Sequence, residues 1–121
     1  MAEDNELNRE ISLELLISAG AQVETAVNGQ ECVEFFAQSV PGYFDLILMD
    51  IQMPIMNGYD AARQIRTMDR PDALAIPIFA ITADAFAEDM EEAKKAGMNS
   101  HLAKPLDIPA MMQEIKKYLE P

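Results

Sequence analysis

The sequence predicts an α/β fold in which helices cover both faces of a parallel, doubly wound sheet. Stretches with strand character alternate with stretches with helix character along the 121 residues, a pattern typical of strand–helix–strand units. Residues 44–49 and 76–82 are almost continuously apolar, as expected of strands that are buried on both faces. The chain length suits one domain with a substantial core.

The expected strands are residues 22–27, 44–49, 76–82 and 100–104. The second ends at Asp50 and is followed by turn residues that include Pro54 and Gly58. Pro77 interrupts the third only near its start, and Pro105 ends the last. Each strand therefore has a recognisable end, at which a polar side chain reaches the edge of the sheet.

The expected helices are residues 6–18, 28–37, 59–68, 86–96 and 108–119. In the first, Leu7, Ile11 and Leu15 recur every four residues and form one apolar face. The fourth has acidic residues early and lysines late, as the helix dipole favours, and Gly97 ends it. The methionine-rich face of the last helix is assigned to the core rather than to a cofactor.

Composition excludes several classes of function. The formal net charge of −12 argues against direct binding of nucleic acid or anionic lipid. No apolar run approaches the roughly 20 residues of a membrane span, so membrane insertion is not expected. Cys32 is the only cysteine, which favours a reduced, cytoplasmic protein over a disulfide scaffold and a packing role for this side chain.

Polar residues that follow the strands are expected to converge. Asp50, Thr82 and Lys104 each end a predicted strand. Because the carboxyl ends of parallel strands lie at one edge of the sheet, where ligands bind in open α/β folds, these side chains should lie together. Glu3 and Asp4 lie just before the first helix, where a preceding strand would bring them to the same edge.

Such an arrangement favours a cation and phosphoryl chemistry. Crowded carboxylates repel each other by roughly 1–4 kcal/mol per pair at effective dielectric constants of 20–80, and oxygen ligands without His or Cys select Mg²⁺ or Mn²⁺. With its charge masked, Asp50 can attack a phosphoryl group as a nucleophile. Lys104 and the Thr82 hydroxyl would then meet the charge on the phosphoryl oxygens. Each residue also has an ordinary interpretation as a cap, strand residue or surface charge.

In combination, these residues resemble the receiver domains of two-component response regulators over essentially residues 1–121. The matching pieces are Glu3-Asp4-Asn5, Met49-Asp50-Ile51-Gln52-Met53-Pro54 with Asn57-Gly58, Ile81-Thr82-Ala83, Ala96-Gly97-Met98 and Lys104-Pro105. The resemblance implies a flavodoxin-like (βα)5 fold with strand order 2-1-3-4-5. It also implies transfer of phosphate from a phosphohistidine to Asp50. The sequence of residues 80–85 and of Gly97-Met98 is most similar to receivers of hybrid sensor histidine kinases. Membership of such a kinase would tether the domain to a membrane sensor.

The resemblance also assigns roles to individual residues. Mg²⁺ would be held by Asp4, Asp50 and the backbone carbonyl of Gln52, with Glu3 helping through water. Thr82 would move toward the phosphoryl group, Lys104 would bridge to it, and the bond before Pro105 would be cis, which X-Pro bonds tolerate at low energetic cost.

Switching, phosphoryl lifetime and docking are implied in the same way. His101 stands where the family commonly has the switching Tyr or Phe, so its coupling to a rotamer switch is in question, and an ordinary strand side chain is the simpler interpretation. The side chains of Gln52 and Asp84 would tune phosphoryl lifetime. The partner would be a histidine kinase or a histidine phosphotransfer domain, docked on Leu7, Ile11, Pro105 and Leu106, all of which could instead be ordinary packing residues.

The chain departs from the family pattern at its N-terminus. The first, central strand should precede Glu3, where only Met1 and Ala2 are present, and a strand needs about five residues. We therefore expect a receiver domain, residues 1–121, that is N-terminally truncated and lacks most or all of this strand. Strand exchange in a homodimer, or direct pairing of strands 22–27 and 44–49, would compensate.

Two other functions share parts of this residue pattern. A Mg²⁺-dependent phosphatase of the haloacid dehalogenase type also uses an aspartyl nucleophile, but it carries a second Asp two residues later, where this chain has Gln52, which cannot protonate a leaving group. We therefore expect a phosphoacceptor rather than an enzyme that turns over substrates. The remaining alternative is a protein-interaction module, derived from a receiver, that works without phosphorylation.

Overall fold

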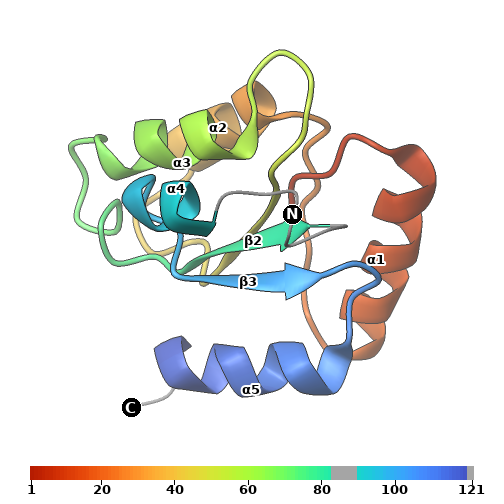
Figure 1. Ribbon diagram of the computed structural model, residues 1–121. Coiled ribbons are helices and arrows are strands. Elements are labelled where there is room, and N and C mark those ends of the chain that lie inside the picture. The colour runs from red at the N-terminus through yellow and green to blue at the C-terminus, as the bar shows by residue number, and fades with distance from the viewer. Residues whose placement is uncertain (83–89, 120–121) are drawn as a thin grey trace.

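The computed structural model describes residues 1–82 and 90–119 and contains a parallel sheet between two layers of helices (Figure 1). In the described part of the chain the named strands are β1 (Ile47–Asp50), β2 (Ile78–Thr82) and β3 (Ser100–Ala103), in the order β1-β2-β3. In register, Asp50 lies opposite Ile81 and Thr82 opposite Ala103. The ends of neighbouring strands therefore lie at the same edge.

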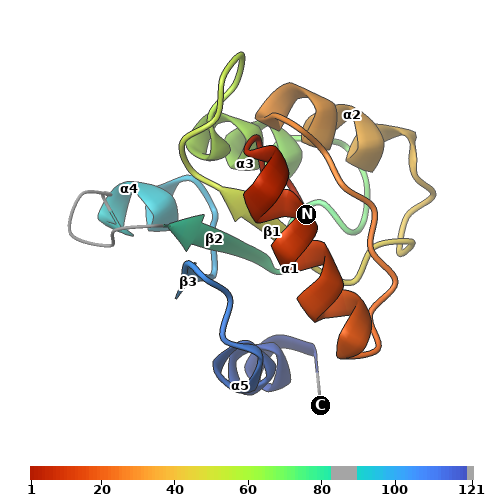
Figure 2. The same ribbon diagram turned by 90° about the vertical axis from the view of Figure 1, so that its right-hand side faces the viewer.

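Five helices flank this sheet in the described ranges: α1 (Glu6–Ser18), α2 (Gly29–Gln38), α3 (Gly58–Arg66), α4 (Met90–Lys95) and α5 (Ile108–Leu119). Helices α2, α3 and α4 pack with Ile47, Met49 and Ala80 in one core cluster. Helices α1 and α5 pack with Leu48 and Phe79 in a second cluster on the opposite face (Figure 2). Successive strand residues thus enter opposite cores, which confirms the predicted α/β fold with helices on both faces. No described helix is long and apolar enough to span a bilayer.

Asparagine caps determine where three of the helices begin. The side chains of Asn5, Asn28 and Asn57 each accept a hydrogen bond from a backbone amide in the first turn of α1, α2 and α3. This bond satisfies one of the amide groups that a helix leaves unpaired at its start. The predicted bounds of the first and last helices, 6–18 and 108–119, are confirmed.

The other strands and helices differ from the predictions mainly at their ends. Strand β2 begins at Ile78 instead of residue 76, because Pro77 has no amide to donate and its carbonyl instead accepts from Ile47. Strand β1 begins three residues later than expected. The predicted helix 86–96 is described only from Met90, since residues 83–89 lie outside the described part.

The prediction of a regular strand at residues 22–27 is wrong. Only Ala26 forms a bridge, to Ala2, which also bridges Met49. The N-terminal bridge, residues 1–3, lies between the 22–27 segment and β1, so the suggested direct pairing of those two segments is also wrong. Within residues 22–27, parallel bridge pairing occurs only at Ala26, which lies beside the N-terminal bridge. The spatial order is nevertheless that of a flavodoxin-like sheet, with 22–27 beside residues 1–3, followed by β1, β2 and β3.

Arg66 joins α3 to the loops before β2 and β3. Its guanidinium donates to the carbonyls of Gly97, Ala73 and Ile76 and to Asn99 Oδ1 at 2.7–3.0 Å. Burial lowers the pKa of this group. The amide of Ile78, at the start of β2, in turn donates to Asn99 Oδ1 at 2.8 Å.

We expect Arg66→Met to lower the free energy of unfolding by about 2–3 kcal/mol, because it leaves carbonyls without a charged donor. Arg63→Met, on the same helix, is the matched control. The Arg63 side chain is 42% exposed and pairs with Asp60 and Glu92, and such surface pairs contribute about 0–1 kcal/mol. Urea unfolding of both variants checks this, and equal losses would contradict it.

Candidate functional site

The carboxyl edge of the sheet brings together most of the residues that the sequence singles out. Asp50 is the last residue of β1 and Thr82 the last of β2, and both are buried. Lys104 directly follows β3, and its backbone amide donates to the Thr82 carbonyl at 2.9 Å. The predicted convergence of strand ends is therefore present.

Lys104 lies at the centre of the side-chain contacts. Its Nζ donates to Asp50 Oδ2 at 2.9 Å and to Glu3 Oε1 at 3.1 Å. Both carboxylates are almost inaccessible, with exposed fractions of 5% for Asp50 and 2% for Glu3. A single ammonium thus bridges two buried carboxylates that lie far apart in the sequence, an arrangement that needs good geometry to offset the cost of desolvation.

A third carboxylate completes an acidic cluster. Glu3, Asp4 and Asp50 each present an oxygen within 4.8 Å of the others, and Asp4 is exposed. Glu3 Oε2 is buried and, although it lies 2.9 Å from Lys104 Nζ, accepts no hydrogen bond of acceptable geometry. Three carboxylates facing one ammonium leave negative charge and a buried lone pair unsatisfied, so the donor set fits a hard cation such as Mg²⁺.

The electrostatics of Asp50 reflect this crowding. Burial raises the pKa of Asp50 to about 7; Lys104 opposes this shift, and the Glu3 carboxylate adds to it. For Lys104, burial acts to lower the pKa, but hydrogen bonds to Glu3 and Asp50 outweigh it and hold the pKa above its ordinary value. The Lys104 ammonium therefore stays charged, while the raised pKa of Asp50 brings the protonation of this carboxyl close to neutral pH.

The N-terminal bridge positions Glu3 and Asp4. The Ala2 amide donates to Leu48 at 2.8 Å, the Asp50 amide donates to Ala2 at 3.0 Å, and the Glu3 amide donates to Ala26 at 3.0 Å. Arg9 Nη1 donates to the Glu3 carbonyl at 3.0 Å. These bonds fix the backbone of both acids beside the end of β1.

Two contributors were not identified from the sequence. Arg9 sits one turn into α1, and only its spacing from Glu3 could have indicated the contact. Gly58 belongs to the Asn57-Gly58 part of the family motif, but the sequence does not show its steric role: a Cβ there would lie 2.4 Å from the Asp50 carbonyl oxygen. Its amide also donates to Ile51 at 2.8 Å. This glycine lets α3 begin directly against the end of β1.

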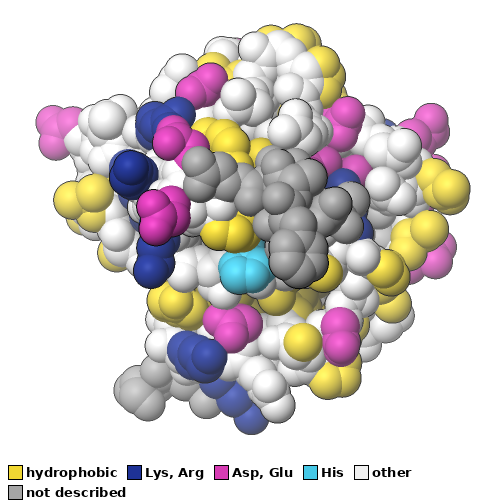
Figure 3. Space-filling view, in the orientation of Figure 1, with side chains coloured by type: hydrophobic (Ala, Val, Ile, Leu, Met, Phe, Trp, Pro, Cys, Tyr) yellow, Lys and Arg dark blue, Asp and Glu magenta, His cyan; other side chains and the backbone are white. Residues whose placement is uncertain are grey.

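The other predicted residues are placed less centrally. Gln52 is exposed in the turn after β1, and the peptide bond before Pro105 is cis. His101 is exposed on β3, on a face where Figure 3 shows acidic and basic side chains interspersed around α4. Leu106 is buried against α5 and β2. Asp84 lies outside the described residues.

Comparison with known proteins places this site in a family. Residues 1–116 match the family model described as the response regulator receiver domain. A hybrid signal transduction histidine kinase (I) of Dictyostelium discoideum is 35% identical over 127 aligned residues, covering 99% of this chain and 7% of the kinase. The chain thus spans only a small part of that relative.

Solved structures agree with this assignment. The receiver domain of sensor histidine kinase PA1611 from Pseudomonas aeruginosa, with a magnesium ion in its active-site cleft, has a TM-score of 0.87 and 32% identity, covering 99% of this chain and 94% of that one. The receiver domain of Ssk1, crystallised with the phosphotransfer protein Ypd1 of Saccharomyces cerevisiae, has a TM-score of 0.79 and 29% identity, with coverages of 98% and 85%. The chain belongs to the response regulator receiver domain family.

Proposed function

We propose that this domain accepts a phosphoryl group from a phosphohistidine onto Asp50 in a Mg²⁺-dependent reaction and signals by a conformational switch. One observation carries the proposal. The buried Asp50 carboxylate contacts the Lys104 ammonium, and the Glu3 and Asp4 carboxylates lie within 4.8 Å. A nucleophile, a cation for the phosphoryl oxygens and ligands for a metal are therefore within reach of one another.

The proposed chemistry assigns one role to each group. An Asp50 oxygen attacks phosphorus, the phosphorus–nitrogen bond of the donor breaks, and its electron pair returns to the imidazole. Lys104 moves from its bridge between the carboxylates to the phosphoryl oxygens, and the Thr82 hydroxyl contacts them from the next strand. Asp4, Asp50, the Gln52 carbonyl and, through water, Glu3 would hold Mg²⁺ (or Mn²⁺), which would neutralise charge on the phosphoryl oxygens.

The proposed partner is a histidine phosphotransfer domain or a histidine kinase, by analogy with the Ypd1–Ssk1 complex. Leu7 and Ile11 on α1 are 64% and 44% exposed, which supports a docking role together with Pro105. Leu106 is only 6% exposed, so we leave it out of this surface. His101, Gln52 and Asp84 remain proposed determinants of switching and phosphoryl lifetime, and a receiver within a hybrid kinase is the proposed context.

The second candidate is an interaction module that does not accept phosphate. The contacts of Lys104 favour it, because its bonds to Glu3 and Asp50 would have to break before it could reach a phosphoryl group.

Incubation with acetyl phosphate and Mg²⁺ should add one phosphoryl group, which intact-mass spectrometry detects. Asp50→Asn should abolish the addition, because an amide is not a nucleophile. Asp45→Asn, which changes an exposed acid shortly before the same strand, should not. A gain that persists in Asp50→Asn would contradict the assigned acceptor. No gain in a cooperatively folded wild type would favour the interaction module.

Saturating Mg²⁺ should raise the free energy of unfolding by about 1–3 kcal/mol, because the ion binds only the folded site. Asp4→Asn should remove most of this increase by removing a ligand. Glu6→Gln changes an exposed acid in the first turn of α1 and should preserve it. Thermal melts with and without chelator measure the difference. An equal Mg²⁺ effect in both variants would exclude Asp4 as a ligand.

Without metal, stability should fall as pH rises from about 4 to about 7. The folded-state pKa of Asp50 is raised to about 7 from an ordinary 3.8, so the folded protein binds this proton more tightly than the unfolded chain does. The stabilisation that this bound proton gives the folded state is complete below about pH 4 and is lost above about pH 7. Asp50→Asn should be the more stable protein at pH 7.5, by about 1–2 kcal/mol after allowance for solvent screening.

Urea titrations at a series of pH values, in chelator, test this slope. The wild type and Asp50→Asn curves should converge toward pH 4. Parallel curves would show that Asp50 titrates normally in the folded protein.

A further inference from the structure

Arg9 lies where the local electrostatics are unusual for a cation. It is one turn into α1, near the positive end of the helix dipole, which disfavours basic side chains. The neighbouring residues are acidic, since Glu3 and Asp4 belong to the acidic cluster and Glu6 begins the helix. An arginine in such surroundings ordinarily forms an ion pair with one of the carboxylates.

The Arg9 guanidinium contacts the backbone instead. Its Nη1 donates to the Glu3 carbonyl at 3.0 Å and to the Asp4 carbonyl at 3.4 Å. Within residues 1–82 and 90–119, this guanidinium forms no ion pair with a carboxylate. One half-buried side chain thus binds two consecutive carbonyls and leaves the carboxylates of both residues to the acidic cluster.

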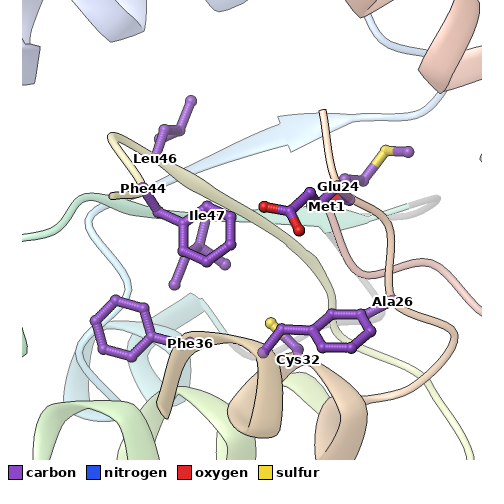
Figure 4. Close-up of a pocket in the computed structure, with 9 residues that line it drawn as sticks. Met1, Glu24, Ala26, Cys32, Phe36, Phe44, Leu46 and Ile47 are labelled. Atoms are coloured by element: carbon purple, nitrogen blue, oxygen red, sulfur yellow. The ribbon is translucent and has the colours of Figure 1, made fainter. Parts of the chain in front are cut away.

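The Arg9 bonds support the segment that connects the sheet to α1. On one side of this segment, the Glu3 amide donates to the Ala26 carbonyl at 3.0 Å. Ala26 is buried and lines a small cavity of about 30 Å³ beside Cys32 (Figure 4). Two residues after Glu3, the side chain of Asn5 caps the helix. Between these two attachments, the Arg9 side chain holds the carbonyls of the residues that carry two of the three carboxylates.

We propose that Arg9 is a positioning residue for the acidic cluster, and that its hold on the Glu3 and Asp4 carbonyls raises the affinity of the cluster for Mg²⁺ although Arg9 is itself a cation. The role rests on the proposed function, which assigns Mg²⁺ to these carboxylates. Mg²⁺ demands near-ideal ligand geometry, so the direction in which each acidic side chain leaves the backbone matters. Two fixed carbonyls set that direction.

Charge and positioning predict opposite results when Arg9 is replaced. Arg9→Met removes a positive charge beside the site, so charge alone predicts tighter Mg²⁺ binding. Solvent and salt weaken this repulsion, because Arg9 is only half-buried. Loss of the two carbonyl bonds predicts weaker binding, since removal of the groups that orient metal ligands reduces affinity by about 10–100-fold. Positioning therefore outweighs charge if Arg9 acts as proposed.

Isothermal titration calorimetry with Mg²⁺ alone tests the sign. Arg9→Met should raise the dissociation constant about tenfold. Arg9→Lys keeps a charged donor but lacks the planar guanidinium, so it should raise the dissociation constant by only about threefold. Arg63→Met removes the same charge from α3, where Arg63 pairs with Asp60 and Glu92. This matched control should change the dissociation constant by less than about twofold, because the charge that it removes is exposed and screened.

Phosphorylation by acetyl phosphate provides a second readout. In Arg9→Met, the Mg²⁺ concentration that gives half of the maximal rate should rise by the same factor as the dissociation constant. The rate at saturating Mg²⁺ should fall much less, because excess ion compensates for a poorly positioned ligand. A merely structural role for Arg9 would instead lower the melting temperature of the metal-free protein and leave the half-saturating Mg²⁺ concentration unchanged.

Equal or tighter Mg²⁺ binding by Arg9→Met would overturn the proposed role of Arg9 alone, and so would an equal loss of affinity in Arg63→Met. No Mg²⁺ binding by the wild type would overturn the proposed metal site and this role with it. If Arg9→Met does not fold, Arg9→Lys decides the question, because it keeps the charge and should still bind Mg²⁺ more weakly than the wild type. Wild-type affinity in Arg9→Lys would then overturn the role.

Discussion

Four backbone hydrogen bonds around Ala2 hold the acidic site together. They join Ala2 to Leu48 and Asp50 on one side, and Met1 and Glu3 to Ala26 on the other, at 2.8–3.0 Å. Asp50 is anchored by β1, whereas Glu3 and Asp4 lie at the end of the N-terminal bridge. The position of two of the three carboxylates therefore depends on a bridge of three residues, and any loss of its pairing separates the cluster.

Charge balance explains why this short bridge remains in place. Lys104 approaches both Glu3 and Asp50 within about 3 Å, so a single ammonium ties the bridge to β1 across the sheet. The same ammonium cannot neutralise three carboxylates, so it does not offset the burial and the neighbouring Glu3 carboxylate that raise the pKa of Asp50. Lys104 thus has two competing tasks, since it stabilises the metal-free arrangement and is also the group proposed to contact a phosphoryl oxygen. A bound cation would release it for the second task.

Local sequence signals predicted most of this arrangement. Continuous apolar runs located β1 and β2, and Asp50 and Lys104 marked strand ends that the register then brought together. Strand 22–27 was mispredicted because its pairing depends on residues 1–3, which are distant in sequence. The roles of Arg9 and Gly58 were missed for a related reason. A hydrogen bond from a side chain to a distant carbonyl, or a lack of space for a Cβ, produces no periodic pattern in the sequence. Resemblance to a family supplied the roles that geometry alone did not assign.

Pairing of the N-terminal bridge and cation binding should be thermodynamically linked, because Glu3 belongs both to the bridge and to the acidic cluster. The backbone pairing of residues 1–3 restricts the motion of Glu3, so part of the conformational cost of ordering this carboxylate is met before a cation binds. Reciprocity requires a cation held by Glu3 and Asp4 to strengthen the pairing of the bridge by the same factor. The backbone hydrogen bonds that join residues 1–3 to the sheet therefore also place the proposed metal ligands.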